Sequence, residues 1–304
     1  MDDMDFTKLL GDEGLCAGLA GGIAEKHGIG LPGQRIRQGS NLLFGFGDGL
    51  VLKLFSRDES YFRDNEALFL RKLDGRLSVK VPALHHTGEL EGYPYLIMDR
   101  LDGSPLETVW DTLDRPSKLR LSSEAGALLK ELHSLPTELA QGCVPDWGTF
   151  IEGQKESITE NHAGYGLDPS RIDEIIDFID DFAPIEEFVS PVVCHTEIMR
   201  EHLFVTGRGG NTRLSGVIDF EPSMLAVPQY DLCAVGLFVT SGDPELFGAF
   251  LESYGSSEDT SVPSITRMLL LHRYSNMNWF ISTLPVDLRG SDLLTMGDYW
   301  FGRP

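Results

Sequence analysis

The second half of the chain contains a short polar segment with three side chains suited to acid–base or metal chemistry: His195, Glu197 and His202. An apolar segment follows it, and a second apolar segment ends in the carboxylate of Asp219. A carboxylate at the end of an apolar strand can hold a hard cation such as Mg²⁺ beside phosphate oxygens. Charged loops are also common on protein surfaces, and a His-x-Glu sequence alone has low specificity. The pattern therefore has two interpretations, a solvated loop or a phosphate-handling site.

A lysine in the first half of the chain favours the phosphate-handling site. Lys53 interrupts the apolar run 51–55, and Glu66 follows in a segment with helical periodicity. A lone lysine in an apolar strand is commonly an exposed edge residue. Phosphoryl transfer, however, needs a cation on the phosphates, an acid that orients it, a group that accepts the hydroxyl proton and a metal ligand. Lys53, Glu66, Glu197 and Asp219 supply these groups in that order along the chain.

Hydrophobic periodicity predicts the elements that must position these residues. Spacing typical of helices covers 6–27, 60–73, 116–133, 169–182 and 265–283. Short runs typical of strands cover 34–41, 41–47, 49–55, 79–87, 93–100, 192–195, 203–205 and 214–220. Most strands precede the helices, so we expect an α+β fold with a small sheet-containing lobe at 1–101 and a larger, mostly helical lobe at 102–304 that carries one embedded hairpin.

The composition excludes several classes of protein. The 304 residues include 25 Lys and Arg against 47 Asp and Glu, which gives a net charge of −22. Such a charge repels nucleic acid and anionic membranes, so we expect neither as a partner. The four cysteines form no C-x-x-C pair, the first residues are acidic where a signal peptide would be basic, and no apolar run is long enough to span a bilayer. We expect a cytoplasmic monomer.

Short segments in a fixed order resemble the aminoglycoside phosphotransferase family, and within it the hygromycin B phosphotransferases most closely. The segments are 51–55, 65–67, 95–101, 131–133, 195–205, 217–220, 229–232 and 284–288. They extend over nearly the whole chain. The resemblance implies a bilobal, protein-kinase-like fold and transfer of a phosphoryl group from ATP or GTP, with Mg²⁺, to a hydroxyl group of a small molecule.

The resemblance also implies roles for particular residues. The residues expected to bind the nucleotide are Ser40, Asn41, Lys53, Glu66, Met98, Asp99, Arg100 and Leu101. Glu197 and His195 take the catalytic positions, and Asp219 with His202 takes the magnesium positions. Asp231 takes the position of the aspartate that supports the catalytic loop.

Two of these positions depart from the family. Glu197 stands where the family carries Asp, and His202 stands where it carries Asn. The extra methylene displaces the carboxylate by roughly 1 Å, a misplacement that can cost about 10²-fold in rate. An imidazole is a softer ligand than an amide oxygen and suits Mg²⁺ poorly. A degenerate kinase that binds nucleotide or drug without turnover is therefore the alternative, and a zinc hydrolase with His195, Glu197 and His202 as ligands is a third hypothesis.

The acceptor is expected to be a cationic small molecule, such as the aminoglycoside hygromycin B. Residues 152–187 contain eleven acidic and two basic side chains. A solvated helical face explains most of them, but the resemblance implies that this region walls the acceptor pocket and attracts ammonium groups. Trp147, Trp279, Trp300 and Tyr299 are candidate pocket residues, although core packing is the simpler interpretation. His133 is expected to cap the helix that it ends.

Overall fold

The chain forms two compact units in the computed structural model, which describes residues 3–30, 32–37, 39–47, 49–180, 190–255 and 260–302. The N-terminal unit contains Met1–Gly103 together with Ser215–Pro222. The C-terminal unit contains Ser104–Leu214 together with Ser223–Pro304. Among the described residues, no helix is both long and apolar enough to cross a membrane.

The N-terminal unit is built on a five-stranded antiparallel sheet with the strand order β1-β2-β3-β5-β4. Its elements are α1 (Asp3–Gly11), α2 (Glu13–His27), β1 (Pro32–Ile36), β2 (Leu42–Phe46), β3 (Leu50–Leu54), α3 (Ser60–Leu73), β4 (Leu84–Leu90) and β5 (Tyr93–Asp99). β3 is a central strand, paired with β2 on one side and β5 on the other. Lys53 therefore lies in the middle of the sheet and not on its edge.

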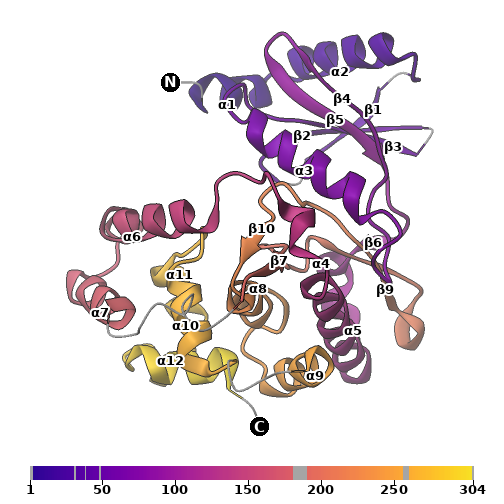
Figure 1. Cartoon of the computed structure of the whole chain (residues 1–304). Coiled ribbons are helices and arrows are strands. Elements are labelled where there is room, and N and C mark those ends of the chain that lie inside the picture. Colours follow the sequence, from indigo (N-terminus) through magenta and orange to yellow (C-terminus); the bar gives the residue numbers. More distant parts are fainter. Residues whose placement is uncertain are drawn as a thin grey trace. The chain divides into compact units, whose positions relative to one another are not determined.

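The two faces of this sheet have different partners, because successive side chains of a strand point to opposite faces. Leu52 and Leu54 of β3 belong to one apolar core with Ile23 of α2. Lys53 lies between the two leucines in sequence and points to the other face, where it meets Glu66 of α3. Figure 1 shows α1 and α2 on one side of the sheet and α3 on the other. The alternation along β3 thus directs Lys53 toward α3.

The C-terminal unit is mostly helical. Its helices are α4 (Leu106–Val109), α5 (Arg115–His133), α6 (Trp147–Gly164), α7 (Pro169–Asp180), α8 (Pro228–Ala234), a π-helix (Val235–Val239), α9 (Pro244–Tyr254), α10 (Val262–Leu270), α11 (Met277–Thr283) and α12 (Leu293–Phe301). Short 3₁₀ turns cover Trp110–Thr112, Thr137–Ala140, Gly209–Asn211 and Val286–Leu288. Its strands are β6 (Ser104–Pro105), β7 (Val192–Cys194), β8 (Leu203–Thr206), β9 (Arg213–Val217) and β10 (Met224–Ala226). Residues 215–217 of β9 belong to the N-terminal unit.

Helices α5 and α9 pack closely in this unit. Asp114 and Asp243 cap their N-termini, with side chains that accept from the backbone N–H groups of Ser117 at 3.0 Å and Leu246 at 3.1 Å. The contact requires a glycine, because a Cβ atom on Gly126 of α5 would lie 2.2 Å from the carbonyl oxygen of Phe250 of α9. The two helices therefore approach backbone to backbone at this position.

The polar segment 195–202 connects strands of two different small sheets. β7 pairs with β10, with Cys194 opposite Met224, whereas β8 lies between β6 and β9. The embedded hairpin predicted for this region is therefore wrong in its pairing, because the first of the expected strands pairs with β10, which the sequence analysis did not identify. His195 follows the end of β7, and Leu203 begins β8.

The α+β fold class is confirmed, with two further local corrections. The helix predicted at 265–283 is two helices, because α10 ends at Leu270 and Asn276 caps α11 by accepting from the N–H of Trp279 at 3.0 Å. The strand predicted at 79–87 begins only at Leu84, after Pro82, which has no N–H to donate. The expected boundary after residue 101 stays a prediction; the compact units divide at Gly103, and residues 215–222 join the first unit through the pairing of Lys80 with Gly216.

Candidate active site

Lys53 is surrounded by three carboxylates of the N-terminal unit. Its Nζ atom lies 2.8 Å from Oε2 of Glu66, 2.5 Å from Oδ1 of Asp219 and 2.6 Å from Oε2 of Glu221. The ion pair predicted between Lys53 and Glu66 is therefore present. Lys53 and Glu66 are almost fully buried, at 4% and 1% exposure. Buried charges of this kind persist only when they are paired.

The electrostatics of this cluster favour an additional cation. Burial on its own lowers the pKa of Lys53, but the carboxylates of Asp219, Glu221 and Glu66 raise it well above its usual value. Burial raises the pKa of Glu66 to about 7, and it also raises the pKa of Glu221. These shifts arise because three carboxylates share one ammonium group in a dry environment.

The donor set fits a magnesium ion. Carboxylate oxygens of Glu66, Asp219 and Glu221 lie within 4.8 Å of one another. Hard oxygen donors are the ligands that Mg²⁺ prefers, and it is commonly held by one or two protein carboxylates together with substrate phosphates. Glu66 is the least suited of the three, because its side chain is 1% exposed, against 24% for Asp219 and 15% for Glu221. Asp219 and Glu221 are therefore the residues that could hold the ion.

Asp219 has an unusual backbone conformation for its position after β9. Its φ angle is +74°, in the left-handed region that aspartate tolerates better than most residues. The next side chain, Phe220, is buried and stacks with Phe69 of α3 at a centroid distance of 6.2 Å. The turn thus anchors Phe220 in the core while the carboxylate of Asp219 reaches Lys53.

The other residues expected to bind the nucleotide have defined neighbours in the same unit. Asn41 donates its side-chain N–H to Oε2 of Glu221 at 3.0 Å, and Ser40 lies exposed in the turn before it. The backbone N–H groups of Asp99 and Arg100 donate to the carbonyl oxygens of Ala83 and Gly49. Met98, Asp99, Arg100 and Leu101 form the end of β5 and the residues after it. The nucleotide-binding role of this segment stays a prediction, and two of its amides are engaged within the unit.

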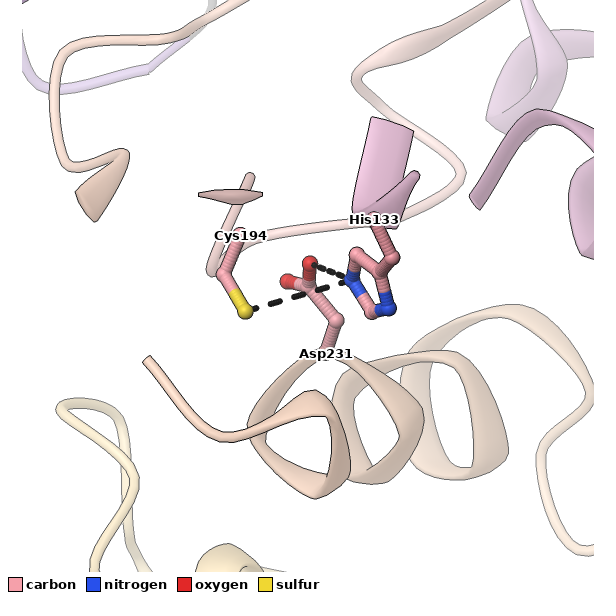
Figure 2. Close-up of side chains that lie close together, drawn as sticks. All are labelled: His133, Cys194 and Asp231. Atoms are coloured by element: carbon pink, nitrogen blue, oxygen red, sulfur yellow. Dashed lines mark hydrogen bonds and ion pairs between the residues drawn. The ribbon is translucent and has the colours of Figure 1, made fainter. Parts of the chain in front are cut away.

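In the C-terminal unit, Asp231 of α8 organises the segment that begins at His195. Its carboxylate accepts from the backbone N–H groups of His195 at 2.9 Å and Thr196 at 2.6 Å. The same carboxylate contacts Nε2 of His133 at 2.9 Å, as Figure 2 shows. Burial raises the pKa of Asp231, but the hydrogen bond from His133 and the nearby charges outweigh burial and hold the pKa below its usual value. Asp231 thus has the supporting geometry that the sequence analysis predicts.

His133, Cys194 and Asp231 resemble a nucleophilic triad but lack its geometry. The two contacts drawn in Figure 2 converge on one nitrogen, because Nε2 of His133 lies 2.9 Å from Asp231 and 3.9 Å from the sulfur of Cys194. A triad needs the acid and the nucleophile on opposite ring nitrogens. Nδ1 of His133 instead faces the hydroxyl of Tyr254 at 2.9 Å, and burial raises the pKa of the Cys194 thiol well above its usual value. His133 therefore supports the loop, and the predicted capping role is wrong.

The backbone of the loop is held from both sides at Thr196. This residue has a φ of +73°, which is rare for a β-branched side chain. Its N–H donates to Asp231, and its carbonyl oxygen accepts from Nε2 of His272 at 3.0 Å. His272 is fully buried, and burial lowers its pKa to about 4. The loop is thus fixed in a strained conformation, which is common where a site must be rigid.

Two imidazoles turn the loop around Glu197. Nδ1 of His195 accepts from the backbone N–H of Glu197 at 3.2 Å. Nδ1 of His202 lies 2.7 Å from the carbonyl oxygen of Glu197, so this nitrogen is the donor and the neutral ring has its lone pair on Nε2. That tautomer suits a metal ligand. His195 is fully buried and acts on the shape of the loop, while the role of His202 as a magnesium ligand stays a prediction.

The carboxylate of Glu197 has an arginine partner. Oε1 of Glu197 lies 3.4 Å from Nε of Arg273, in the connection between α10 and α11, and the two side chains are 6% and 16% exposed. The guanidinium group of Arg273 also lies over the ring of Phe150, 5.3 Å from its centre. Burial alone would lower the pKa of Arg273. The interactions with Tyr230 and Glu197 outweigh burial, so the pKa of Arg273 is above its usual value. Glu197 therefore lies next to a fixed cation.

His195, Glu197 and His202 do not point to a common centre, as the ligands of a zinc ion would. Within the described part of the chain, His195, Glu197 and His202 do not together form a group of ligand atoms close enough to hold one ion. Nδ1 of His195 is occupied by the N–H of Glu197, and the carboxylate of Glu197 faces Arg273. The zinc hypothesis therefore has no support from the geometry of these three residues.

A cavity of about 610 Å³ lies in the C-terminal unit beside the same loop. Met199, Arg200 and Glu201, which follow Glu197 in the chain, contribute to its lining. The volume is typical of a site for a drug-sized molecule. Aromatic side chains make up much of the remaining lining: Tyr165, Phe238, Tyr274, Trp279 and Phe280. Of the four aromatic candidates from the sequence, only Trp279 is among them, and Trp300 is buried in the core.

Sequence reasoning missed three polar residues of the site. The sequence could have identified Glu221, because it follows Asp219 at the two-residue spacing that can place carboxylates on one side of an extended segment. No sequence pattern identifies Arg273 and His272, since they lie in a break between helices that the periodicity of 265–283 concealed. Their contacts with Glu197 and Thr196 join segments more than seventy residues apart.

Comparison with known proteins gives one family. The sequence model described as "Phosphotransferase enzyme family" matches residues 35–267. Solved structures with a similar fold include the GDP complex of an aminoglycoside 2′-phosphotransferase-IIIa, with a TM-score of 0.68 and 18% identity over 92% of this chain and 94% of that one. An ADP-bound aminoglycoside phosphotransferase APH(2″)-Ib has a TM-score of 0.62 and 19% identity over 94% and 99%. A macrolide 2′-phosphotransferase from Brachybacterium faecium has a TM-score of 0.59 and 17% identity over 91% and 97%.

Proposed function

The chain belongs to the phosphotransferase enzyme family and is a small-molecule kinase, and we propose that it transfers the γ-phosphoryl group of ATP or GTP to a hydroxyl group of a cationic small molecule. The observation that carries the proposal is the buried Lys53, which pairs with Glu66 and with Asp219. A cation fixed by one carboxylate and placed beside a second, metal-binding carboxylate is the arrangement that phosphoryl transfer requires.

In this proposal the N-terminal unit holds the phosphates. Lys53 contacts phosphate oxygens, and Glu66 keeps its side chain in place. Asp219 and Glu221 would hold Mg²⁺, and His202 would be a further ligand through Nε2. Bound Mg²⁺ would neutralise the charge of the phosphate oxygens. A carboxylate that bound the ion instead of Lys53 would leave the lysine available to the nucleotide.

The C-terminal unit supplies the group that handles the acceptor hydroxyl. Glu197 orients the hydroxyl and takes its proton as the oxygen bonds to the γ-phosphorus. The bond between that phosphorus and the bridging oxygen breaks, and the nucleoside diphosphate leaves. The transition state is loose, so the position of the carboxylate matters more than its basicity. Asp231, through two backbone N–H groups, sets that position.

The acceptor that we propose first is an aminoglycoside-type antibiotic such as hygromycin B. The support is the resemblance in sequence and the names of structural neighbours that are aminoglycoside phosphotransferases. A net charge of −22 favours a cationic acceptor. Phosphorylation of a hydroxyl would then inactivate the drug and confer resistance, and the chain would act as a monomer in the cytoplasm.

The test is mass analysis of candidate antibiotics after incubation with ATP or GTP and Mg²⁺. We expect one added phosphoryl group with the wild type, and loss of at least 10²-fold in rate with Asp219→Asn. Asp102→Asn is the matched control, because this aspartate is 86% exposed in the same unit. Retained activity in Asp219→Asn would refute the role of Asp219.

A degenerate kinase is the second candidate, and the pairing of Glu197 with Arg273 favours it, since a carboxylate held by arginine is less available to a hydroxyl. It predicts binding of nucleotide by wild type, measured by calorimetry, without phosphorylated product from any acceptor. It also predicts that Glu197→Asp, with the shorter side chain of the family, gains turnover. Under the active-kinase proposal, both Glu197→Asp and Glu197→Gln lose rate.

A further inference from the structure

The cavity of the C-terminal unit is rich in aromatic side chains that remain open to solvent. Tyr165, Tyr274 and Trp279 line it and are 50%, 51% and 48% exposed. Phe238 stacks with Trp279 at a centroid distance of 6.1 Å and an interplanar angle of 13°. Exposed aromatic side chains gathered around one hollow mark a ligand site rather than a core. The lining therefore offers aromatic side chains to an occupant.

The charge of the lining matches one cation. Glu107 and Glu201 contribute carboxylates and Arg200 contributes a guanidinium group, which leaves a net charge of −1. Arg200 is directed at other partners: it donates to the carbonyl oxygen of Val239 at 2.9 and 2.6 Å, and its guanidinium carbon lies 4.0 Å from the centre of the Trp110 ring. Glu107 lies 4.0 Å from Arg200. Glu201 is thus the exposed carboxylate best placed to balance a bound cation.

The acidic region expected to wall the acceptor pocket contributes little to this lining. Of residues 152–180, which are the described part of that region, Tyr165 lines the cavity and none of the carboxylates does. A polycation would need several carboxylates around it. The cavity instead combines several aromatic side chains with two acids, of which Glu107 lies 4.0 Å from Arg200.

We propose that this cavity binds the acceptor through a single tertiary or quaternary ammonium group, which lies against the aromatic side chains and is balanced by Glu201. The inference rests on the proposed kinase function, and it replaces the polycationic aminoglycoside with an acceptor that carries one alkylated amine. Ring faces attract cations, and alkylated ammonium groups are the cations that aromatic sites bind best. A primary ammonium has three N–H donors that each require an acceptor.

The size of the cavity places this ammonium on a larger molecule. A volume of about 610 Å³ exceeds what a small amino alcohol fills and suits a drug-sized ligand. The apolar share of the lining, which includes Leu237 and Met199, favours a scaffold with apolar surface as well as hydroxyl groups. The substrate class is therefore a hydroxylated, largely apolar molecule with one alkylated amine.

The experiment compares three probes by calorimetry on the full chain: a macrolide with a dimethylamino sugar, the same macrolide without the two N-methyl groups, and hygromycin B. We expect the dimethylamino form to bind at least tenfold more tightly than either of the others. Trp279→Leu should weaken its binding about tenfold and Glu201→Gln several-fold. Trp279→Phe, which keeps a ring, should bind within about threefold of wild type.

A charge variant of helix α6, Glu156→Gln with Glu160→Gln, is the matched control and should leave this affinity unchanged. Equal binding of the two macrolide forms overturns the inference, and so does tight binding of hygromycin B that the α6 variant weakens and Trp279→Leu does not. Phosphoryl transfer is measured separately. If hygromycin B is the only probe that is phosphorylated, the kinase function is supported and the proposed acceptor class is overturned. If the dimethylamino macrolide binds selectively but no probe is phosphorylated, the kinase function is contradicted and the proposed ligand class is supported. If a variant fails to fold, the affinities of the wild type for the three probes still test the inference.

Discussion

The longer side chain at position 197 has a physical consequence at the scale of single residues. Its carboxylate lies 3.4 Å from Nε of Arg273, and both side chains are largely buried. A buried carboxylate without a cation would carry a large desolvation cost. The arginine offsets this cost, and it also restricts where the carboxylate can lie. Arg273 is therefore a positioning residue for Glu197.

Replacement of Arg273 tests this role. Arg273→Met should lower kcat about 10²-fold with little change in the KM of the nucleotide, because the carboxylate loses its fixed position. Arg273→Lys keeps the charge and should restore part of the rate. Lys155→Met, on the exposed face of α6, is the control and should behave as wild type. Initial rates at saturating nucleotide measure the effect, and equal rates for the methionine and lysine variants would show that the charge of residue 273 has no positioning role.

His272 gives the loop a dependence on pH. Burial lowers its folded pKa to about 4, below the value of 6.5 for an ordinary histidine. The unfolded chain therefore binds more protons between these two values, and the free energy of unfolding falls as the pH drops through this window. We expect a loss of about 2 kcal/mol between pH 7 and pH 5 from this residue. His272→Gln should remove that part of the loss in urea unfolding, whereas the exposed variant His85→Gln should keep it. An unchanged slope in His272→Gln would contradict the assignment.

At the scale of elements, local pattern and long-range packing explain different parts of the molecule. The helix predicted at 60–73 matches α3, since its apolar spacing is regular and nothing interrupts it. The pairing of Lys53 with Glu66 followed from the same local patterns. The break after Leu270 could not be predicted, because His272 and Arg273 leave the helix to contact Thr196 and Glu197. Such contacts depend on the fold and leave no periodic signal.

The packing of α5 against α9 yields a prediction with a control in the same unit. Gly126→Ala should destabilise the protein by about 2 kcal/mol, because the added Cβ would lie 2.2 Å from the carbonyl oxygen of Phe250. Gly153→Ala on α6 has no heavy atom within 4 Å of its added Cβ, so the same substitution should stabilise by about 0.5–1 kcal/mol through helix propensity. Urea unfolding measures both. Similar effects at the two positions would mean that the close approach of α5 and α9 is not present in solution.

The whole molecule carries a charge far larger than that of its cavity. The net charge is −22, whereas the lining of the cavity has a net charge of −1. The net charge of the whole molecule acts over distance and is screened by salt, with a Debye length of about 10 Å at 0.1 M. The charge of the cavity lining acts in contact with the ligand and is screened less. The two charges should therefore affect different steps of binding.

Ionic strength should separate these steps for a cationic acceptor. Raising the ionic strength from 0.01 M to 0.5 M should slow association several-fold, because the long-range attraction that steers the cation is screened. Dissociation should change little, because contacts with ring faces are short-range. Stopped-flow fluorescence can follow both rates, since Trp279 is about half exposed at the cavity. The N-oxide of the same amine, which has no net charge, is the control. If salt slowed the association of the amine and of its N-oxide equally, steering by the charge of the molecule would be excluded. If salt changed only the dissociation rate, the cation would be held by exposed carboxylates rather than by the aromatic lining.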